Sequence, residues 1–186
     1  MAFLDSLPET AHLSDLFKKF PVGLKPLLEY HDEILRKNGA IPVGQRELIA
    51  AYVSTLNSCS FCADSHSHIA QQFDIDPGLI EKLKINIDSS GVDDNLKPIL
   101  AYVKKLTLTP SKIVKQDIDK ILSSGWSEEA VYLAASICAL FNFMNRVVSG
   151  FGISSDSINK DRFNDGSHLS GSSYKNFGKK MGFQFN

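Results

Sequence analysis

Residues 43–73 of the chain read VGQRELIAAYVSTLNSCSFCADSHSHIAQQF. Apolar residues at three- and four-residue spacing predict a helix over residues 43–56, and the polar residues after it end that helix. A polar N-cap position then opens a second helix, from roughly residue 60 to residue 73. Cys59 and Cys62 are therefore expected at the N-terminal end of the second helix.

The same helical spacing recurs along the whole chain of 186 residues, and strand signals are scarce. The sequence therefore predicts an all-α protein with a single domain. It divides into N-terminal helices at residues 1–40, a core at 41–152 and a C-terminal arm at 153–186. The arm carries Phe163, Tyr174, Phe177, Phe183 and Phe185, which indicates packing along the body or against a neighbouring subunit. Further helices are expected over residues 14–20, 24–37, 77–83, 95–106, 115–123 and 128–149.

The overall composition argues against several classes of partner. Twenty basic and twenty-one acidic residues give a net charge of -1, without a dense basic block, so we expect no nucleic-acid partner. Residues 1–10 lack the features of a signal peptide. The best apolar run, Val131 to Phe143, is shorter than the roughly 18 residues that span a bilayer. We expect a cytoplasmic protein that is not bound to membranes.

Three cysteines are present, and only Cys59 and Cys62 are close in sequence. An odd number of cysteines argues against a structural disulfide framework. Cys138 lies inside an apolar run and is interpreted as a small buried hydrophobic residue.

The Cys59–Cys62 pair, the dithiol, suits redox chemistry. At ~100° per residue, Cys62 lies about 60° and His66 about 20° from Cys59 around the helix, so the three share one face. Thiols at a helix N-terminus favour the thiolate form. A thiolate that attacks a hydroperoxide becomes a sulfenic acid, and a second thiol one turn away condenses with it to form a disulfide.

Such a reaction also needs a group that moves protons near neutral pH. His66 fits that role, and Glu47 on the preceding helix is the best-placed acid to fix the tautomer of His66. Without the dithiol, Glu47 would be interpreted as a solvated carboxylate at a helix start. The remaining histidines are interpreted as surface residues: His12, His31, His68 and His168.

A zinc site is the main structural alternative for the Cys-x-x-Cys pair. Zinc requires four ligands, and Cys59, Cys62 and His66 on one helix leave the fourth to another segment. The sequence offers no second cysteine pair or paired histidines for it. We expect neither a metal nor a cofactor.

The segment from Arg46 to His68 resembles the core motif of the AhpD-like alkylhydroperoxidases, which belong to the carboxymuconolactone decarboxylase superfamily. That motif is a glutamate, twelve positions to a cysteine, three to a second cysteine and four to a histidine. The residues that match it are Glu47, Cys59, Cys62 and His66. Residues 140–146, followed by Gly150, are similar to the peroxidase-related branch of the family, so the resemblance covers roughly residues 20 to 155.

The resemblance implies a helical bundle that forms dimers, trimers or hexamers and acts as a thiol-dependent peroxidase in antioxidant defence. It implies that Cys62 forms the sulfenic acid, that Cys59 donates a proton and then closes the disulfide, and that Glu47 and His66 form the relay. The reductant would be a thiol, such as a lipoyl-bearing or thioredoxin-like protein. Relatives often carry a second histidine where this chain has Phe61, so the role of that histidine cannot be carried over. We hypothesise that Phe61 favours a bulky or apolar hydroperoxide.

Two other functions stay open at this point. One is a cofactor-free lactone decarboxylase, which needs acid–base groups and no dithiol. The other is a redox switch or interaction protein whose dithiol changes a partner contact without peroxide turnover. The physiological peroxide, the electron donor, the oligomer size and the role of the arm are also left open by the sequence.

Overall fold

The computed structural model describes residues 1–158 and 166–185, and Phe163 of the arm lies outside this range. The described residues form nine α-helices and no strand, which confirms the all-α prediction. The helices are α1 (Leu13–Lys19), α2 (Leu24–Leu35), α3 (Val43–Leu56), α4 (Ser60–Gln71), α5 (Leu79–Ile85), α6 (Lys97–Leu108), α7 (Lys115–Ser123), α8 (Glu128–Gly150) and α9 (Ser173–Lys180). Short 3-10 turns lie at Pro110–Lys112, Ser155–Ser157 and Ser167–Leu169.

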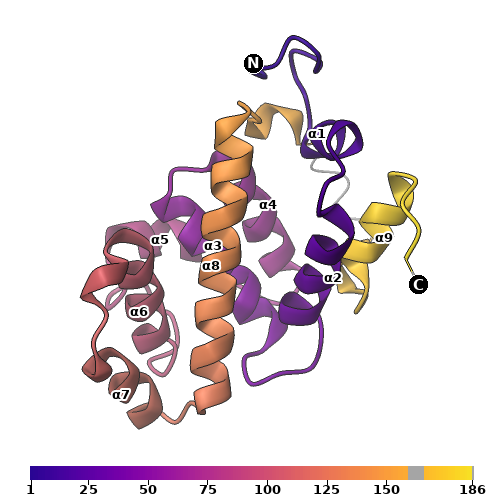
Figure 1. Cartoon of the computed structure of the whole chain (residues 1–186). Coiled ribbons are helices and arrows are strands. Elements are labelled where there is room, and N and C mark those ends of the chain that lie inside the picture. The colour runs from indigo at the N-terminus through magenta and orange to yellow at the C-terminus, as the bar shows by residue number, and fades with distance from the viewer. Residues whose placement is uncertain (159–165, 186) are drawn as a thin grey trace.

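Helix α3 is the centre of the molecule. Its residues 46–54 are all buried, since the helix packs against α4, α8, α6 and α5 on different sides. In Figure 1, α8 crosses the front of the molecule, with α5, α6 and α7 on one side and α2 and α9 on the other. A charged residue on α3 therefore lies in the protein interior and needs a partner there.

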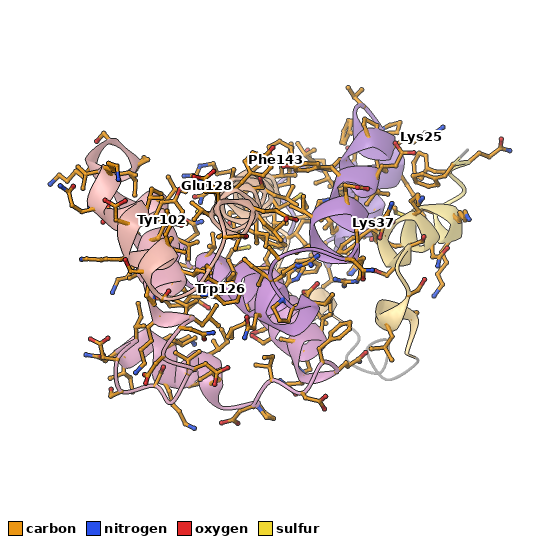
Figure 2. All side chains as sticks on the ribbon, turned by 90° about the horizontal axis from the view of Figure 1, so that it is seen from below. Lys25, Lys37, Tyr102, Trp126, Glu128 and Phe143 are labelled. Carbon is orange, nitrogen blue, oxygen red and sulfur yellow. The ribbon has the colours of Figure 1, made fainter. Side chains whose placement is uncertain are left out.

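Helix α8 is the longest helix, with 23 residues. Ser127 caps its N-terminus by accepting a hydrogen bond from the Ala130 N–H, at 3.2 Å. Although its continuous apolar run, Val131 to Phe143, is too short to do so alone, the whole of α8 could cross a membrane by length and composition. Because 56% of that stretch is buried inside the protein, α8 resembles the core helix of a globular fold. Phe143 lies on its outer surface (Figure 2) and is 51% exposed.

The C-terminal arm folds back onto the N-terminal part of the chain, and α9 lies beside α2 (Figure 1). Gly178 makes this close approach possible. A methyl group at Gly178 would lie 2.5 Å from the Phe185 ring and 2.8 Å from Leu28 Cδ1, so a larger residue would push α9 away from α2. The arm thereby reaches the same region of the molecule as the dithiol helix.

Candidate functional site

The turn between α3 and α4 places the dithiol. Ser58 adopts a left-handed conformation with φ 57°, and the Cys59 N–H then donates to the Ser54 carbonyl at 2.9 Å. Cys59 is the N-cap residue of α4 and Cys62 lies in its first turn, as the sequence predicts. Both thiols are free and buried, with exposures of 3% and 4%. The N-terminal end of α4 thus presents the dithiol to the protein interior.

Glu47 lies at the centre of a buried charge cluster, and its interpretation as a solvated carboxylate is therefore wrong. Its side chain has no exposed surface; Arg36 donates to one carboxylate oxygen, and His66 Nδ1 lies 2.5 Å from the other. Burial alone would raise the pKa of Glu47. The positive charge of Arg36, followed by the interaction with His66, outweighs burial and lowers the pKa of Glu47 to about 2. Glu47 is thus a permanent anion near neutral pH.

The hydrogen bond to Glu47 fixes the tautomer of His66. An ionised carboxylate can only accept, so the hydrogen of the imidazole must lie on Nδ1. Nε2 of neutral His66 is then the free base. The ring is held edge-on against Phe141, with 4.4 Å between the ring centroids and 80° between the planes. The structure therefore joins two of the sequence-predicted residues, Glu47 and His66, as a base and the group that orients it.

Arg36 is a residue of this site that the sequence prediction missed. Its guanidinium Nε also donates to the Ser173 hydroxyl at 2.8 Å, and its centre lies 5.0 Å from the Tyr174 ring and 5.8 Å from the Phe73 ring. Although burial alone would lower the pKa of Arg36, the charge of Glu47 raises it. Because Arg36 follows α2 and lies outside the motif, its position near the end of an N-terminal helix gave no signal of this role.

The two thiols share one proton. The hydrogen bond from the Cys62 thiol is the largest influence on Cys59; burial opposes it, but the pKa of Cys59 still falls to about 6. The Cys62 N–H, Ser149 and Asn145 also lower the pKa of Cys59. The same thiol hydrogen bond, followed by burial, raises the pKa of Cys62 well above its ordinary value. At rest, the pair therefore holds a single negative charge, centred on Cys59.

Asn145 on α8 is a second residue that the prediction did not assign. Its amide donates to the Ser54 hydroxyl at 3.0 Å and lowers the pKa of both thiols. Its carbonyl accepts from the Asn57 amide at 2.9 Å. Asn145 thus ties the dithiol turn to α8. Asn145 lies within residues 140–146, whose similarity to the peroxidase-related branch was noted in the sequence, but that similarity gave Asn145 no role.

Two histidines that were interpreted as surface residues are less exposed than expected, since His31 is buried and His12 is half-buried. His31 is 3% exposed, and its Nδ1–H donates to the Leu27 carbonyl at 2.7 Å; burial is the main reason that its pKa falls to about 4. His12 caps α1, and its ring contacts the Phe61 ring, with 5.4 Å between centroids. The prediction for His31 was wrong because α2 packs against α8 and α9, whose Phe141 and Tyr174 rings contact the His31 ring.

The other two histidines are His68, which lies away from the His31 and His12 contacts, and His168. His68 is half-buried, and its Nδ1–H donates to the Asp64 carbonyl at 2.7 Å, one turn back on α4. The side chain of His168 lies outside the described residues.

Cys138 is buried as predicted, beside Thr107 and Asn142, with a pKa raised by burial. Within residues 1–158 and 166–185, no group of three or more His, Cys, Asp or Glu residues could hold a metal ion.

A cavity of about 140 Å³ lies beside the dithiol. Cys62 and His66 line it, whereas Cys59 does not. Most of its other lining residues are apolar or aromatic, and they come from α1, α2, α4, α8 and the C-terminal arm. A small molecule in this cavity would therefore contact Cys62 and not Cys59.

Fold and site together define a helical protein with a buried dithiol next to an oriented histidine. Residues 23–82 match the profile of the carboxymuconolactone decarboxylase family, a segment that includes Arg36 and every residue of the predicted motif. This segment is similar to that family, and the described chain has the AhpD-like fold.

Individual relatives carry the same fold or sequence pattern. The uncharacterized protein YdfG of Bacillus subtilis (strain 168) is 27% identical over 132 residues, which cover 71% of this chain and 88% of YdfG. A peroxidase-related protein with an AhpD core from Ralstonia eutropha JMP134 superposes with a TM-score of 0.72 at 22% identity, over 85% of this chain and 79% of that one. The debrominase Bmp8, in complex with 2,3,4-tribromopyrrole, superposes with a TM-score of 0.60 at 20% identity, over 89% and 80%.

Proposed function

We propose that this protein is a thiol peroxidase that reduces organic hydroperoxides through Cys62 and Cys59. One observation carries the proposal: Cys62 and His66 line a single cavity, and the His66 imidazole is held by the buried Glu47 at 2.5 Å. A nucleophile, a base and a substrate-sized space thus occur together. The peroxidase-related name of the structural relative from Ralstonia eutropha JMP134 agrees with this chemistry.

The first step begins with the proton that the thiols share. Transfer of this proton from Cys62 to Cys59 gives a Cys62 thiolate at the cavity wall and a Cys59 thiol beside it. The Cys62 sulfur then attacks the terminal oxygen of the hydroperoxide; a sulfur–oxygen bond forms and the oxygen–oxygen bond breaks. The Cys59 thiol protonates the departing alkoxide, which leaves as an alcohol, and Cys62 becomes a sulfenic acid.

The second step closes the disulfide. The Cys59 thiolate attacks the Cys62 sulfur and displaces hydroxide, which His66 Nε2 protonates to water with a proton taken from solvent. The sum is two thiols and one hydroperoxide converted to a disulfide, an alcohol and water. A dithiol reductant, lipoyl-bearing or thioredoxin-like, returns two electrons and two protons to the disulfide.

We also propose that the protein works as a homo-oligomer.

The assignment of Cys62 as the attacking thiol rests on access. The lower pKa belongs to Cys59, which would favour Cys59 as the nucleophile on charge alone. The cavity, however, is lined by Cys62. Proton transfer along one hydrogen bond inside the pair is a small rearrangement, whereas bringing a peroxide to Cys59 would require the cavity to be rebuilt. We therefore assign Cys62 as the nucleophile because it lines the cavity, even though Cys59 carries the negative charge at rest.

The test is peroxide consumption with dithiothreitol or dihydrolipoamide as reductant. We expect Cys62→Ser and Cys59→Ser to abolish turnover, and Cys138→Ser, which changes a buried thiol outside the cavity, to retain it. A dimedone-type reagent that traps sulfenic acids should label Cys62 in the Cys59→Ser protein. Undiminished turnover in both dithiol variants would overturn the dithiol mechanism, whereas a wild type without peroxide turnover would leave the lactone decarboxylase and redox-switch alternatives.

A second candidate is reductive debromination of an aromatic ring. It is favoured by the shared fold with Bmp8, whose structure holds a brominated pyrrole, and by the aromatic lining of the cavity. The Cys62 thiolate would take the bromine, the ring carbanion would take a proton, and Cys59 would displace bromide to form the disulfide. Bromide release from 2,3,4-tribromopyrrole under the same reducing conditions tests it.

A further inference from the structure

The cavity beside Cys62 has the size of one aromatic ring. Its volume is about 140 Å³, and a dry apolar cavity of about 150 Å³ holds a benzene molecule. Hydrogen peroxide would leave most of that apolar wall without contacts, whereas a ring would fill it. The cavity is therefore larger than the reacting group of a hydroperoxide alone requires.

Aromatic side chains dominate the walls of the cavity. They include His12, His31, Phe61, Phe141, Tyr174 and Phe177. Several meet edge to face, as His12 and Phe61 do at 63° between ring planes. Ring edges and faces in this arrangement offer an aromatic guest the offset and T-shaped contacts that it prefers. His31, whose pKa is lowered to about 4, adds no charge at neutral pH.

The C-terminal arm builds one wall of this cavity. Tyr174 and Phe177 of α9 line it, and both lie outside the segment that matches the family profile, residues 23–82. Two contacts fix α9 in place: Asp32 accepts the N–H groups at its N-terminus, and Arg36 donates to Ser173. The arm is thus bonded to the same arginine that holds Glu47.

We propose that α9 makes the cavity a binding site for one aromatic ring, so that the preferred substrates are alkyl hydroperoxides that carry an aryl ring, such as cumene hydroperoxide. The ring contacts Tyr174 and Phe177, and the peroxide group faces Cys62. The substrate class rests on the proposed peroxidase function, while the ring site does not. The reaction is the one already balanced, with an aryl-substituted alcohol as the product.

Binding is tested first, without turnover. The probe is 2-phenylpropan-2-ol, the alcohol formed from cumene hydroperoxide, with tert-butanol as the ligand that lacks a ring, measured by calorimetry and by the shift in melting temperature. We expect the wild type to prefer the aryl alcohol at least tenfold, and Phe177→Ala to lose that preference. Phe143→Ala, the matched control on the exposed face of α8 (Figure 2), should retain it.

Turnover is tested second, as the ratio of kcat/KM for cumene hydroperoxide to that for hydrogen peroxide. We expect Phe177→Ala to lower the ratio at least tenfold, Phe143→Ala to leave it unchanged, and Ser65→Leu, which fills the cavity from α4, to lower it while hydrogen peroxide turnover persists. Turnover of hydrogen peroxide without any ring preference in binding would overturn the ring site alone. Ring binding without turnover of any hydroperoxide would support the ring site and overturn the peroxidase proposal.

Discussion

Asp32 on α2 and Tyr174 on α9 are 142 residues apart in sequence and are joined by a hydrogen bond of 2.9 Å, in which the Tyr174 N–H donates to the Asp32 carboxylate. The second carboxylate oxygen accepts the Lys175 N–H, also at 2.9 Å. One buried side chain on α2 thus satisfies two free N–H groups at the start of α9. This contact attaches the arm to the body of the protein.

Replacing Asp32 should detach the arm without unfolding the core. Asp32→Ala leaves two N–H groups of α9 without acceptors, and the loss of such a cap costs about 0.5–2 kcal/mol. We expect faster proteolytic cleavage between residue 153 and α9, while cleavage within α3 and α8 stays slow. Asp32→Asn keeps one acceptor oxygen, so its rate of cleavage should lie between the rates of the wild type and Asp32→Ala. Equal cleavage rates in all three proteins would contradict this role of Asp32.

The ion pair of Arg36 and Glu47 should behave as a unit. Glu47→Gln leaves the Arg36 charge buried without its anion, and breaking a buried pair costs about 3–5 kcal/mol. The double variant Arg36→Met/Glu47→Gln removes both charges and should regain most of that stability in urea denaturation. Peroxide turnover should stay low in the double variant because His66 has lost the carboxylate that orients it. Additive losses in the double variant would show that the two residues are not coupled.

His31 should make the protein less stable in mild acid. Its pKa is about 4 in the folded protein and 6.5 ordinarily, so between these values the unfolded chain binds a proton that the folded chain does not. Stability is therefore retained above pH 6.5 and lost as the pH falls toward 4, by about 2 kcal/mol at pH 5. His31→Gln, which does not titrate, should reduce the loss between pH 7 and pH 5 in urea denaturation. An identical loss in both proteins would rule out His31 as its source.

The dithiol should carry a thiolate in mildly acidic solution. With the pKa of Cys59 at about 6, the ultraviolet absorbance of the thiolate should rise through pH 6 and level off above neutrality. Cys62→Ala removes the hydrogen bond that most lowers this pKa, so the midpoint should move toward 9. Cys138→Ser in both backgrounds removes the third thiol from the measurement. A midpoint that does not move would mean that the thiols do not share a proton.

Asn145 should tune the dithiol from α8. Asn145→Ala removes an amide that stabilises the thiolate, and we expect a higher pH midpoint for thiolate absorbance and a slower peroxide reaction at pH 6. Asn145→Asp, which brings a negative charge to the same place, should raise the midpoint further. The control is Asn142→Ala, one turn earlier on α8 and bonded to Thr107 and Cys138. Equal midpoints in all four proteins would remove Asn145 from the site.

Much of the site follows from local sequence. The helical spacing of residues 43–73 predicts both helices, and the spacing of Cys59, Cys62 and His66 predicts one face of α4 because helix geometry depends only on the positions of residues along the chain. The polar turn after α3 was visible in the same way. Local rules of this kind also predicted the ends of α1, α2, α5, α6, α7 and α8 to within a few residues, whereas the helix α9 within the arm was not predicted.

The sequence by itself determined the all-α fold, the dithiol at a helix start and the motif of Glu47 and His66, since these depend on near neighbours and fixed spacings. Only the tertiary structure decided that Arg36 neutralises Glu47, that His31 is buried, and that α9 forms one wall of the cavity beside Cys62. These contacts join segments that are distant along the chain, and no local periodicity records which helices will pack together. The charge of the relay and the shape of the cavity therefore emerge only when α2, α4, α8 and α9 meet.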